Sequence, residues 1–332
     1  MKEIIVTGGL GFIGSNFIQL ALDNLPNTKI INIDNETYAA DTSLNAIFNK
    51  NKNYTYLKID ICDELKISEL FNKHNIDAVV NFAAESHVDN SISEPDIFLK
   101  TNIFGTFNLL NSLKNSINKD ATFLHVSTDE VYGTLELEES AFTESNAYKP
   151  NSPYSASKAS SDFLVRAWFE TYKMNVITTN CSNNYGPNQN SEKLIPKIIR
   201  NAIEGQNIPI YGDGKNIRDW LFVIDHCEAI IKVLNSGNFG QTYNVGGNNE
   251  IQNLDLAYIV LDKLNHYYQI HNLQMPSNVT NFKDLIVFVE DRKGHDFRYA
   301  INCSKIKKHL NWEPRHSFEE GISKTIDWYL QN

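Results

Sequence analysis

The feature that most constrains the fold is a short apolar segment that runs directly into a glycine-rich turn. Ile4-Ile5-Val6 is followed by Thr7-Gly8-Gly9, and Gly9, Gly11 and Gly14 then have the spacing G-x-G-x-x-G. A strand, a tight turn and a helix in this order form the first unit of dinucleotide-binding folds, where the pyrophosphate lies at the helix N-terminus. We therefore expect the chain to fold around a dinucleotide.

The glycines and an acid downstream have separate expected roles. Gly9 and Gly11 would let the backbone turn tightly and approach the pyrophosphate, with Gly8 at the same site, and Gly14 would let the helix pack close to the strand. Asp34 lies 20 residues after Gly14, at the end of the second predicted strand. An acid there accepts hydrogen bonds from the ribose hydroxyls and repels a 2′-phosphate, which favours NAD over NADP.

The first half of the chain alternates short β-branched segments with longer amphipathic ones. This alternation predicts an α/β fold of the Rossmann type, with a doubly wound parallel sheet and right-handed crossovers. The predicted strands are Glu3–Thr7, Lys29–Ile33, Tyr54–Lys58, Ala78–Phe82, Thr122–Ser127 and Asn175–Asn180. The predicted helices are Gly11–Asn24, Glu64–His74, Asp96–Ser116 and Ser155–Tyr172.

The pattern becomes mixed after about residue 185, where loops lengthen and turn residues cluster at 211–214. We expect residues 1–184 to form the NAD-binding domain and residues 185–332 a smaller, mixed α/β substrate-binding portion. A return segment at 223–246 would rejoin the first sheet, so the two parts would interleave. The polar, aromatic and aperiodic stretch 266–282 is predicted to be a surface insertion.

Charge and cysteine content exclude several classes of partner. The formal net charge of the 332 residues is -10, which argues against nucleic acid and against an anionic membrane surface. No apolar stretch approaches the roughly 20 residues of a membrane span, and the N-terminus does not resemble a secretory signal. The four cysteines are widely spread without a C-x-x-C pair. We therefore expect a cytoplasmic protein with reduced thiols and no metal site.

Tyr154 and Lys158 form a Tyr-x-x-x-Lys pair within a predicted helix. Positions i and i+4 share one helix face, and a cation near a phenol lowers its pKa, so the phenolate becomes accessible as a base. A surface pair that arose by chance is the alternative.

Upstream, Thr128-Asp129-Glu130 closes an apolar strand at the sheet edge where ligands bind. The two carboxylates are either solvated loop residues or an acid/base pair whose pKa values are split.

These motifs resemble the extended short-chain dehydrogenase/reductases and, among them, the nucleotide-glucose 4,6-dehydratases. The resemblance runs nearly from end to end of the chain. It is carried by Ala83–Asp89, Thr101–Asn102, Ser127–Gly133, Asn151–Ser160, Asn180–Pro187, Glu192–Pro196, Tyr211–Trp220 and Asp291–Asp296.

The resemblance implies an NAD-dependent, redox-neutral dehydration of a nucleotide sugar, with the catalytic residues Thr128, Asp129, Glu130, Tyr154 and Lys158. Tyr154, with Lys158 and Thr128, would remove the O4 proton while C4 is oxidised. Glu130 would take the C5 proton, and protonated Asp129 would donate to the departing C6 hydroxyl before C6 is reduced. This scheme requires a raised pKa for Asp129.

Binding roles also follow from the resemblance. The expected NAD contacts are Gly8, Gly11, Phe12, Ile13, Gly14, Asp34, Asp60, Ile61, Ala84, Ser86, Thr101, Tyr154, Lys158 and Asn184. The expected substrate contacts are Ser86, Thr128, Asn183, Lys193, Leu194, Pro209, Tyr211, Arg218, Asn253, Arg292 and His295. Four of these residues also have a purely structural interpretation. Asp60 could instead be a helix N-cap, and Arg218 and Arg292 could be ordinary surface arginines. His295 could be an ordinary packed or solvated histidine.

Several functions remain open at this point. The resemblance favours dTDP-glucose as substrate, with UDP-glucose as the alternative, and implies a homodimer formed through the helices at 96–116 and 154–172. A UDP-sugar 4-epimerase or decarboxylase on the same fold would share the glycine loop and the Tyr/Lys pair but would lack Asp129. A non-catalytic NAD-binding sensor would keep only the glycine loop.

Overall fold

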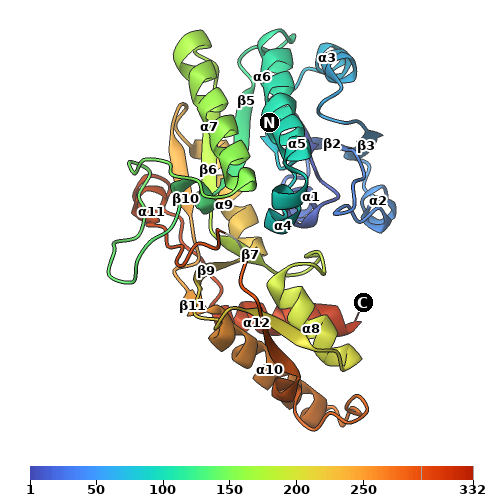
Figure 1. Ribbon diagram of the computed structural model, residues 1–332. Helices are drawn as coiled ribbons and strands as arrows, with labels where there is room; N and C mark the ends of the chain where they lie inside the picture. The colour runs from blue at the N-terminus through green and yellow to red at the C-terminus, as the bar shows by residue number, and fades with distance from the viewer. Residues whose placement is uncertain (293, 332) are drawn as a thin grey trace.

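The computed structural model describes residues 1–292 and 294–331. Its largest sheet has seven strands in the order β10-β6-β5-β4-β1-β2-β3, and all neighbours are parallel (Figure 1). The strands are β1 Glu3–Thr7, β2 Lys29–Asp34, β3 Tyr54–Lys58, β4 Ala78–Asn81, β5 Thr122–Thr128, β6 Val176–Cys181 and β10 Thr242–Val245. The strand order reverses between β1 and β4, so the predicted doubly wound, Rossmann-type fold is confirmed.

Helices cover both faces of this sheet. On β1, Ile4 and Val6 pack into the core beneath α1 (Phe12–Asn24) and α9 (Val223–Ser236). Ile5 points to the opposite face, because successive side chains of a strand alternate. That face is covered by α3 Glu64–Lys73, α6 Thr106–Lys114 and α7 Pro153–Tyr172. Burial on both faces explains why the strands read as continuous apolar runs.

The segment predicted as one helix at 96–116 consists of three pieces. α5 (Pro95–Phe98) continues into a π-helical turn, η1 (Leu99–Gly105), and then into α6. Asn102 in the π turn accepts a hydrogen bond from Glu85 N (2.9 Å) and donates one to Ser157 Oγ (2.8 Å). A π turn widens the helix locally and is frequent at functional sites. Two short helices, α2 (Ser43–Phe48) and α4 (Val88–Ser93), precede these pieces.

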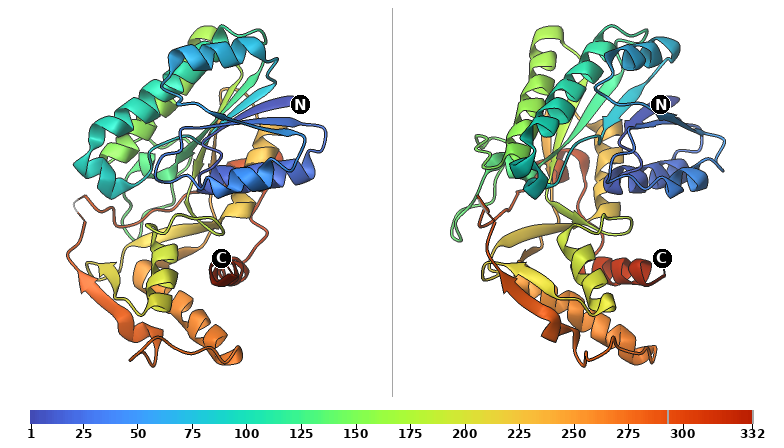
Figure 2. Two further views of the ribbon diagram at one scale, coloured as in Figure 1. Left: turned by 90° about the vertical axis from the view of Figure 1, so that its right-hand side faces the viewer. Right: turned by 45° about the vertical axis from the view of Figure 1, so that its right-hand side comes forward.

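The C-terminal portion has its own hydrophobic core and lies below the large sheet in the views of Figures 1 and 2. It contains the three-stranded sheet β11-β9-β7 and the parallel pair β12-β8. The bounds are β7 Asn183–Tyr185, β8 Ile208–Tyr211, β9 Ile217–Phe222, β11 Glu250–Gln252, β12 Ile286–Val289, α8 Leu194–Glu204, α10 Asn253–Ile270, η3 Phe282–Leu285 and α12 Phe318–Gln331. β10 leaves this portion and pairs with β6, while α11 (Ser304–Leu310) packs on the core beneath α9.

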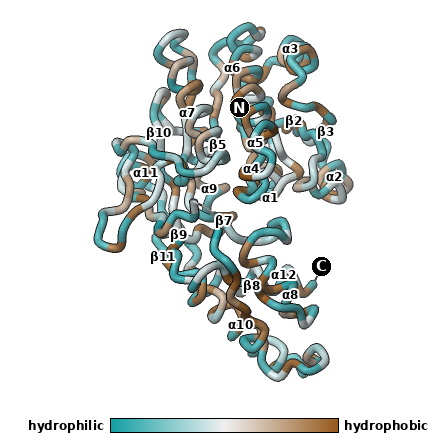
Figure 3. The backbone as a smooth tube through the Cα atoms, in the orientation of Figure 1, coloured by the Kyte–Doolittle hydropathy of each residue, from teal (hydrophilic) through white to brown (hydrophobic). Residues whose placement is uncertain are grey.

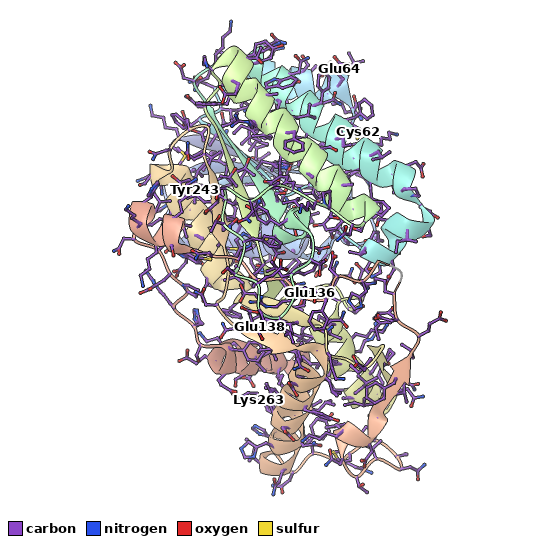
Figure 4. The ribbon with its side chains drawn as sticks, turned by 60° about the vertical axis from the view of Figure 1, so that its left-hand side comes forward. Cys62, Glu64, Glu136, Glu138, Tyr243 and Lys263 are labelled. Atoms are coloured by element: carbon purple, nitrogen blue, oxygen red, sulfur yellow. The ribbon has the colours of Figure 1, made fainter. Side chains whose placement is uncertain are left out.

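The loop between η2 (Asp129–Tyr132) and α7 ties the two portions together. Figure 4 labels Glu136 and Glu138 on this loop and Lys263 on α10 in the C-terminal portion. Arg298 donates hydrogen bonds to the backbone oxygens of Glu136 (3.2 Å) and Glu139 (2.7 Å) and forms an ion pair with Glu250 (2.6 Å). The loop that follows the predicted acid/base pair is therefore anchored across both portions.

The prediction that residues 266–282 form a surface insertion is wrong at both ends of the stretch. α10 runs to Ile270, and Tyr268 and Phe282 are buried in the C-terminal core with ring centroids 5.0 Å apart. The hydrophobic stretches of α10 are visible in Figure 3. Phe282 reaches this core from a separate 3-10 turn, a non-local contact that periodicity does not reveal. Among the described helices, none is long and apolar enough to cross a membrane.

Candidate active site

A single cleft opens at the carboxyl ends of the parallel strands, on both sides of the point where the strand order reverses. Ligands of open α/β sheets bind at this place. The cleft brings together all five residues expected to be catalytic, Thr128, Asp129, Glu130, Tyr154 and Lys158. It also contains every residue expected to contact NAD, namely Gly8, Gly11, Phe12, Ile13, Gly14, Asp34, Asp60, Ile61, Ala84, Ser86, Thr101 and Asn184.

The glycine loop forms one wall of the cleft. Gly11 is the N-cap of α1 and supplies no side chain to cap it, while a Cβ on Gly14 would lie 2.3 Å from Gly8 O. Gly9 does not line the cleft: its N–H donates to Asn32 Oδ1 (3.1 Å), and a Cβ there would lie 2.3 Å from that oxygen. The expectation that Gly9 approaches the pyrophosphate is therefore corrected, because it packs against β2. Gly8 and Gly11 face the cleft.

Two acids lie at the ends of β2 and β3. Asp34 accepts hydrogen bonds from Leu10 N (3.0 Å) and Glu36 N (2.8 Å), and burial raises the pKa of this carboxyl. Asp60 is not the N-cap of α3, because Asp63 fills that position. The Asp60 carboxylate accepts from Asn35 Nδ2 (3.0 Å) instead and faces the cleft, so the capping alternative is excluded.

Tyr154 and Lys158 lie in the first turns of α7, which begins with a capping box of Ser152 and Ser155. The exposed fractions of Tyr154 and Lys158 are 9% and 4%, so they are not a surface pair. Lys158 Nζ donates to Val126 O at 2.8 Å. Burial raises the pKa of Tyr154 well above its ordinary value, and a hydrogen bond with Thr128 opposes this shift. Burial lowers the pKa of Lys158.

Asp129 and Glu130 follow β5 in the η2 turn. Asp129 is 2% exposed, so it is not a solvated loop residue, and its Oδ2 has no hydrogen-bond partner among the described residues. Burial, followed by the charges of Glu130 and Asp219, raises the pKa of Asp129 well above its ordinary value. Burial also raises the pKa of Glu130, but the nearby cations of Arg218 and Lys193 oppose this shift. The surroundings thus favour a protonated Asp129 beside a more readily ionised Glu130, in the direction that the sequence analysis requires.

The residues expected to bind substrate fall into two groups. Ser86, Thr128, Asn183 and Lys193 line the cleft, where Lys193 Nζ donates to Ser86 O at 2.9 Å. The others are not among the residues that line it, namely Leu194, Pro209, Tyr211, Arg218, Asn253, Arg292 and His295. Among these, Arg218 carries a charge that acts on both Asp129 and Glu130.

Arg218 and Arg292 are both held in place. Arg218 is 6% exposed, and its guanidinium donates to the backbone oxygens of Asp296 (2.8 Å) and Phe297 (3.2 Å) while lying over the ring of Tyr299. It is therefore not a surface arginine. Arg292 is partly exposed and pairs with Asp89 (2.6 Å).

His295 is a packed histidine rather than a solvated one, since its side chain is 8% exposed. Its Nδ1 lies 2.7 Å from Asp291 Oδ1, and its ring contacts the edge of Tyr211. Burial lowers the pKa of His295. Arg292 lies over the same Tyr211 ring at 5.2 Å, so Tyr211, Arg292 and His295 form one cluster in the C-terminal portion.

Several cleft residues escaped the sequence analysis. Asn35, Thr37, Ala39 and Ala40 follow β2 and share its sheet edge, so the rule that ligands bind beyond strand ends would have included them. Gln189, Asn190 and Glu192 come from the loop before α8, and nothing in their sequence indicates this position. The four cysteines are free, and among the described residues no group of three or more His, Cys, Asp or Glu is arranged to hold a metal ion.

Comparisons with known proteins agree with this geometry. The model of the GDP-mannose 4,6 dehydratase family matches residues 5–325. A dTDP-glucose 4,6-dehydratase of Xanthomonas campestris pv. campestris (strain B100) is 49% identical over 339 residues, which cover 100% of this chain and 94% of the relative. A dTDP-glucose 4,6-dehydratase of Haemophilus influenzae is 48% identical, and the alignment covers 100% of this chain and 99% of that relative. The crystal structure of DesIV, a dTDP-glucose 4,6-dehydratase from Streptomyces venezuelae with NAD bound, superimposes with a TM-score of 0.90 at 39% identity, covering 99% of this chain and 97% of that chain.

Proposed function

The chain belongs to the nucleotide-sugar 4,6-dehydratase family described by the GDP-mannose 4,6 dehydratase model, and we propose that it converts dTDP-glucose to dTDP-4-keto-6-deoxyglucose and water. It is an NAD-dependent hydro-lyase, and its product would enter deoxysugar nucleotide biosynthesis, for example of the rhamnose type. The observation that carries the proposal is the buried Asp129 beside Glu130 and Tyr154 in one cleft.

The cleft fits NAD. Gly8, Gly11 and Gly14 line the cleft, and the start of α1, which no side chain caps, leaves backbone N–H groups for a pyrophosphate there. Asp34 stands at the end of β2, where the adenosine ribose would lie. When bound, NAD supplies reversible oxidation and reduction of the sugar.

Tyr154 is the base for the proton on the sugar O4. Its phenol is buried, so the neutral form is favoured until a cation compensates, and Lys158 one helical turn away provides that cation. Thr128 hydrogen-bonds the phenol and lines the same cleft, which places a second polar group at O4.

The elimination of water needs a second base and an acid, and Glu130 and Asp129 provide them. A ketone at C4 acidifies the C5 hydrogen, and the ionised carboxylate of Glu130 would accept it as a proton. The nearby cations of Arg218 and Lys193 favour the ionised form of Glu130. Asp129, which burial keeps protonated, donates its proton to the departing C6 hydroxyl. Lys193 and the cluster of Tyr211, Arg292 and His295 supply cations and an aromatic surface for the nucleotide diphosphate.

Two other functions predict different features. A 4-epimerase or a decarboxylase on this fold has no use for a protonated acid at the C6 hydroxyl, whereas here a buried Asp129 lines the cleft together with Glu130. A non-catalytic NAD-binding sensor would have no reason to keep Tyr154, Lys158 and both carboxyls buried together.

The test is to incubate the purified protein with dTDP-glucose in D2O, without added NAD. We expect a product that has lost one water and carries solvent deuterium at C5, identified by mass spectrometry and NMR. A product with inverted C4 and no loss of water would support the epimerase instead. No product, even with NAD supplied, would contradict the proposal.

UDP-glucose in parallel reactions tests the choice of base. Thymine and uracil differ by one methyl group, which discriminates by only roughly 1–3 kcal/mol. We expect a higher kcat/KM for dTDP-glucose. Equal values would leave the dehydration in place and would contradict only the thymine preference.

We also propose that the protein is a homodimer. Exposed apolar side chains gather on two neighbouring helical segments, from α5, η1 and α6 on one side and α7 on the other: Ile97, Leu99, Phe104, Phe107, Phe163 and Tyr172. Phe104 and Phe163 are 62% and 59% exposed, which is unfavourable in a monomer. Light scattering should give the mass of a dimer, and Phe104→Glu with Phe163→Glu should give a monomer. Leu65→Glu, at an exposed position of α3 outside these segments, is the control that should leave the dimer intact.

A cytoplasmic location is part of the same proposal. It is supported by the dependence on NAD and by four free cysteines, of which Cys181 and Cys227 are buried. Fractionation of the source cells would test it, with the protein expected in the cytoplasmic fraction.

A further inference from the structure

Helix α7 carries a third buried titratable residue, besides Tyr154 and Lys158, at a position that contacts the sheet. Tyr154, Lys158 and Asp162 follow one another at intervals of four residues, and Asp162 is only 5% exposed. Figures 1 and 4 show α7 lying along the sheet, where it contacts β5 and β6. A carboxylate at this depth is costly unless it is hydrogen-bonded or paired with a charge.

The partners of Asp162 lie on β5, the strand that leads into Thr128. Ser127 Oγ donates to Asp162 Oδ2 (3.0 Å), and His125 Nε2 lies 3.4 Å from Asp162 Oδ1. Between these two residues on the strand, Val126 O accepts the hydrogen bond from Lys158 Nζ (2.8 Å). Lys158 and Asp162 therefore attach consecutive turns of α7 to the adjacent β5 residues Val126 and Ser127, and His125 lies beside the Asp162 carboxylate.

The other titratable groups around Asp162 and Lys158 are neutral near pH 7. Burial lowers the pKa of His125 to about 4, and burial raises the pKa of Tyr132 and Tyr148, which both face Asp162. Cys181 on β6 faces Lys158, and burial raises the pKa of its thiol to about 12. Asp162 is the carboxylate whose charge acts on Lys158.

We propose that Asp162 is a positioning residue whose buried carboxylate fixes α7 against β5 and holds Lys158 in its charged form beside Tyr154. The inference rests on the proposed function and deepens it. Burial by itself favours a neutral lysine, and a neutral Lys158 would no longer assist deprotonation of the Tyr154 phenol. Asp162 is not among the residues that line the cleft, so its effect would pass through Lys158.

The test variant is Asp162→Asn, which has nearly the same shape, keeps an acceptor for Ser127 and removes the charge. We expect kcat at pH 7 to fall about tenfold with KM for dTDP-glucose unchanged. The acid limb of the kcat profile should move up by about one pH unit, so that activity recovers at alkaline pH. Ser127→Ala is the matched control: it removes the hydrogen bond, leaves the charge, and should not move the acid limb. If the Asp162→Asn variant does not fold, Asp162→Ser replaces it, because serine is smaller and admits water. The same displacement of the acid limb is expected for Asp162→Ser.

A second measurement does not depend on dehydration. Ultraviolet difference titration of the NAD-loaded protein against its Tyr154→Phe variant reports ionisation of the Tyr154 phenol directly. We expect its midpoint to be higher in Asp162→Asn than in the wild type. Equal midpoints, or a lower kcat at every pH without displacement of the acid limb, would overturn the inference. An inactive wild type with a displaced titration would overturn the proposed function and leave the role of Asp162 standing.

Discussion

Arg292 and Asp89 form a two-point ion pair between the two portions of the molecule. Arg292 Nε lies 2.6 Å from Asp89 Oδ1, and Nη2 lies 2.9 Å from Oδ2. Asp89 belongs to α4 beside the NAD-binding sheet, whereas Arg292 follows β12 in the C-terminal portion. One edge of the guanidinium is thus occupied by the carboxylate, and in the proposed function Nη1 would contact the diphosphate.

The first prediction separates these two roles of Arg292. A lysine ammonium cannot pair with Asp89 and at the same time present a separate N–H group to the diphosphate, so for Arg292→Lys we expect KM for dTDP-glucose to rise about tenfold with kcat within about threefold of the wild type. Asp89→Asn weakens only a partly exposed pair and should change KM less than about threefold. Initial rates measured against dTDP-glucose concentration give both KM values. A larger effect of Asp89→Asn would mean that the ion pair between the two portions matters more than a contact between Arg292 and the substrate.

The second prediction concerns the stability cost of Asp129. Because burial raises the pKa of this carboxyl in the folded chain, the folded state holds the proton more tightly than the unfolded state does. Stability is therefore fully present below the unfolded pKa of about 4 and is lost as the pH rises through the folded pKa. Asp129→Asn removes that loss, so its Tm at pH 8 should exceed that of the wild type by on the order of 2–4 °C, and the difference should vanish near about pH 3–4. Thermal melts of the wild type and Asp129→Asn across this pH range measure the difference. Equal Tm values of the two proteins at pH 8 would argue against a raised pKa of Asp129.

The third prediction distinguishes the two carboxyls by activity. Asp129→Asn and Glu130→Gln should each lower kcat for dehydration by about 10²–10⁴-fold, because each removes one proton-transfer group. Only Glu130→Gln should abolish incorporation of solvent deuterium at C5 into recovered substrate and product. Deuterium incorporation that survives Glu130→Gln would assign the C5 base to another residue.

The fourth prediction concerns the glycine loop. A Cβ on Gly14 would lie 2.3 Å from Gly8 O and 2.9 Å from Gly9 Cα, both backbone atoms that cannot move aside. Gly14→Ala should therefore lower both the Tm and the NAD content. On Gly11, at φ -79°, a Cβ would meet only Gly8 O at 3.3 Å, so Gly11→Ala should keep the Tm and lose NAD. Calorimetry together with the NAD released on denaturation would check this, and a stable Gly14→Ala would contradict the close packing.

Much of the molecule could be predicted from local pattern. The strands β1 and β3 have the predicted bounds, β2, β4 and β5 differ by one residue at one end, and β6 is displaced by one residue at both ends. Periodicity and strand-end position were enough to bring Asp34, Tyr154 and Asp129 to one cleft, because parallel strands share a carboxyl edge. The π turn within 96–116 was missed, since its hydrogen-bond pattern leaves no mark on hydrophobic spacing.

The amino-acid sequence by itself determined the order of strands and helices, the glycine cradle and the identity of the reactive groups, because these depend on spacing along the chain. Tertiary structure alone decided that Gly9 packs against Asn32, that Arg218 is buried on Tyr299 and that Phe282 completes a distant core. It also decided the direction in which the pKa of Asp129 moves, since burial and the neighbouring charges of Glu130 and Asp219 raise that pKa. Each of these depends on which atoms fill the space around a side chain, and residues far apart in the chain supply those atoms.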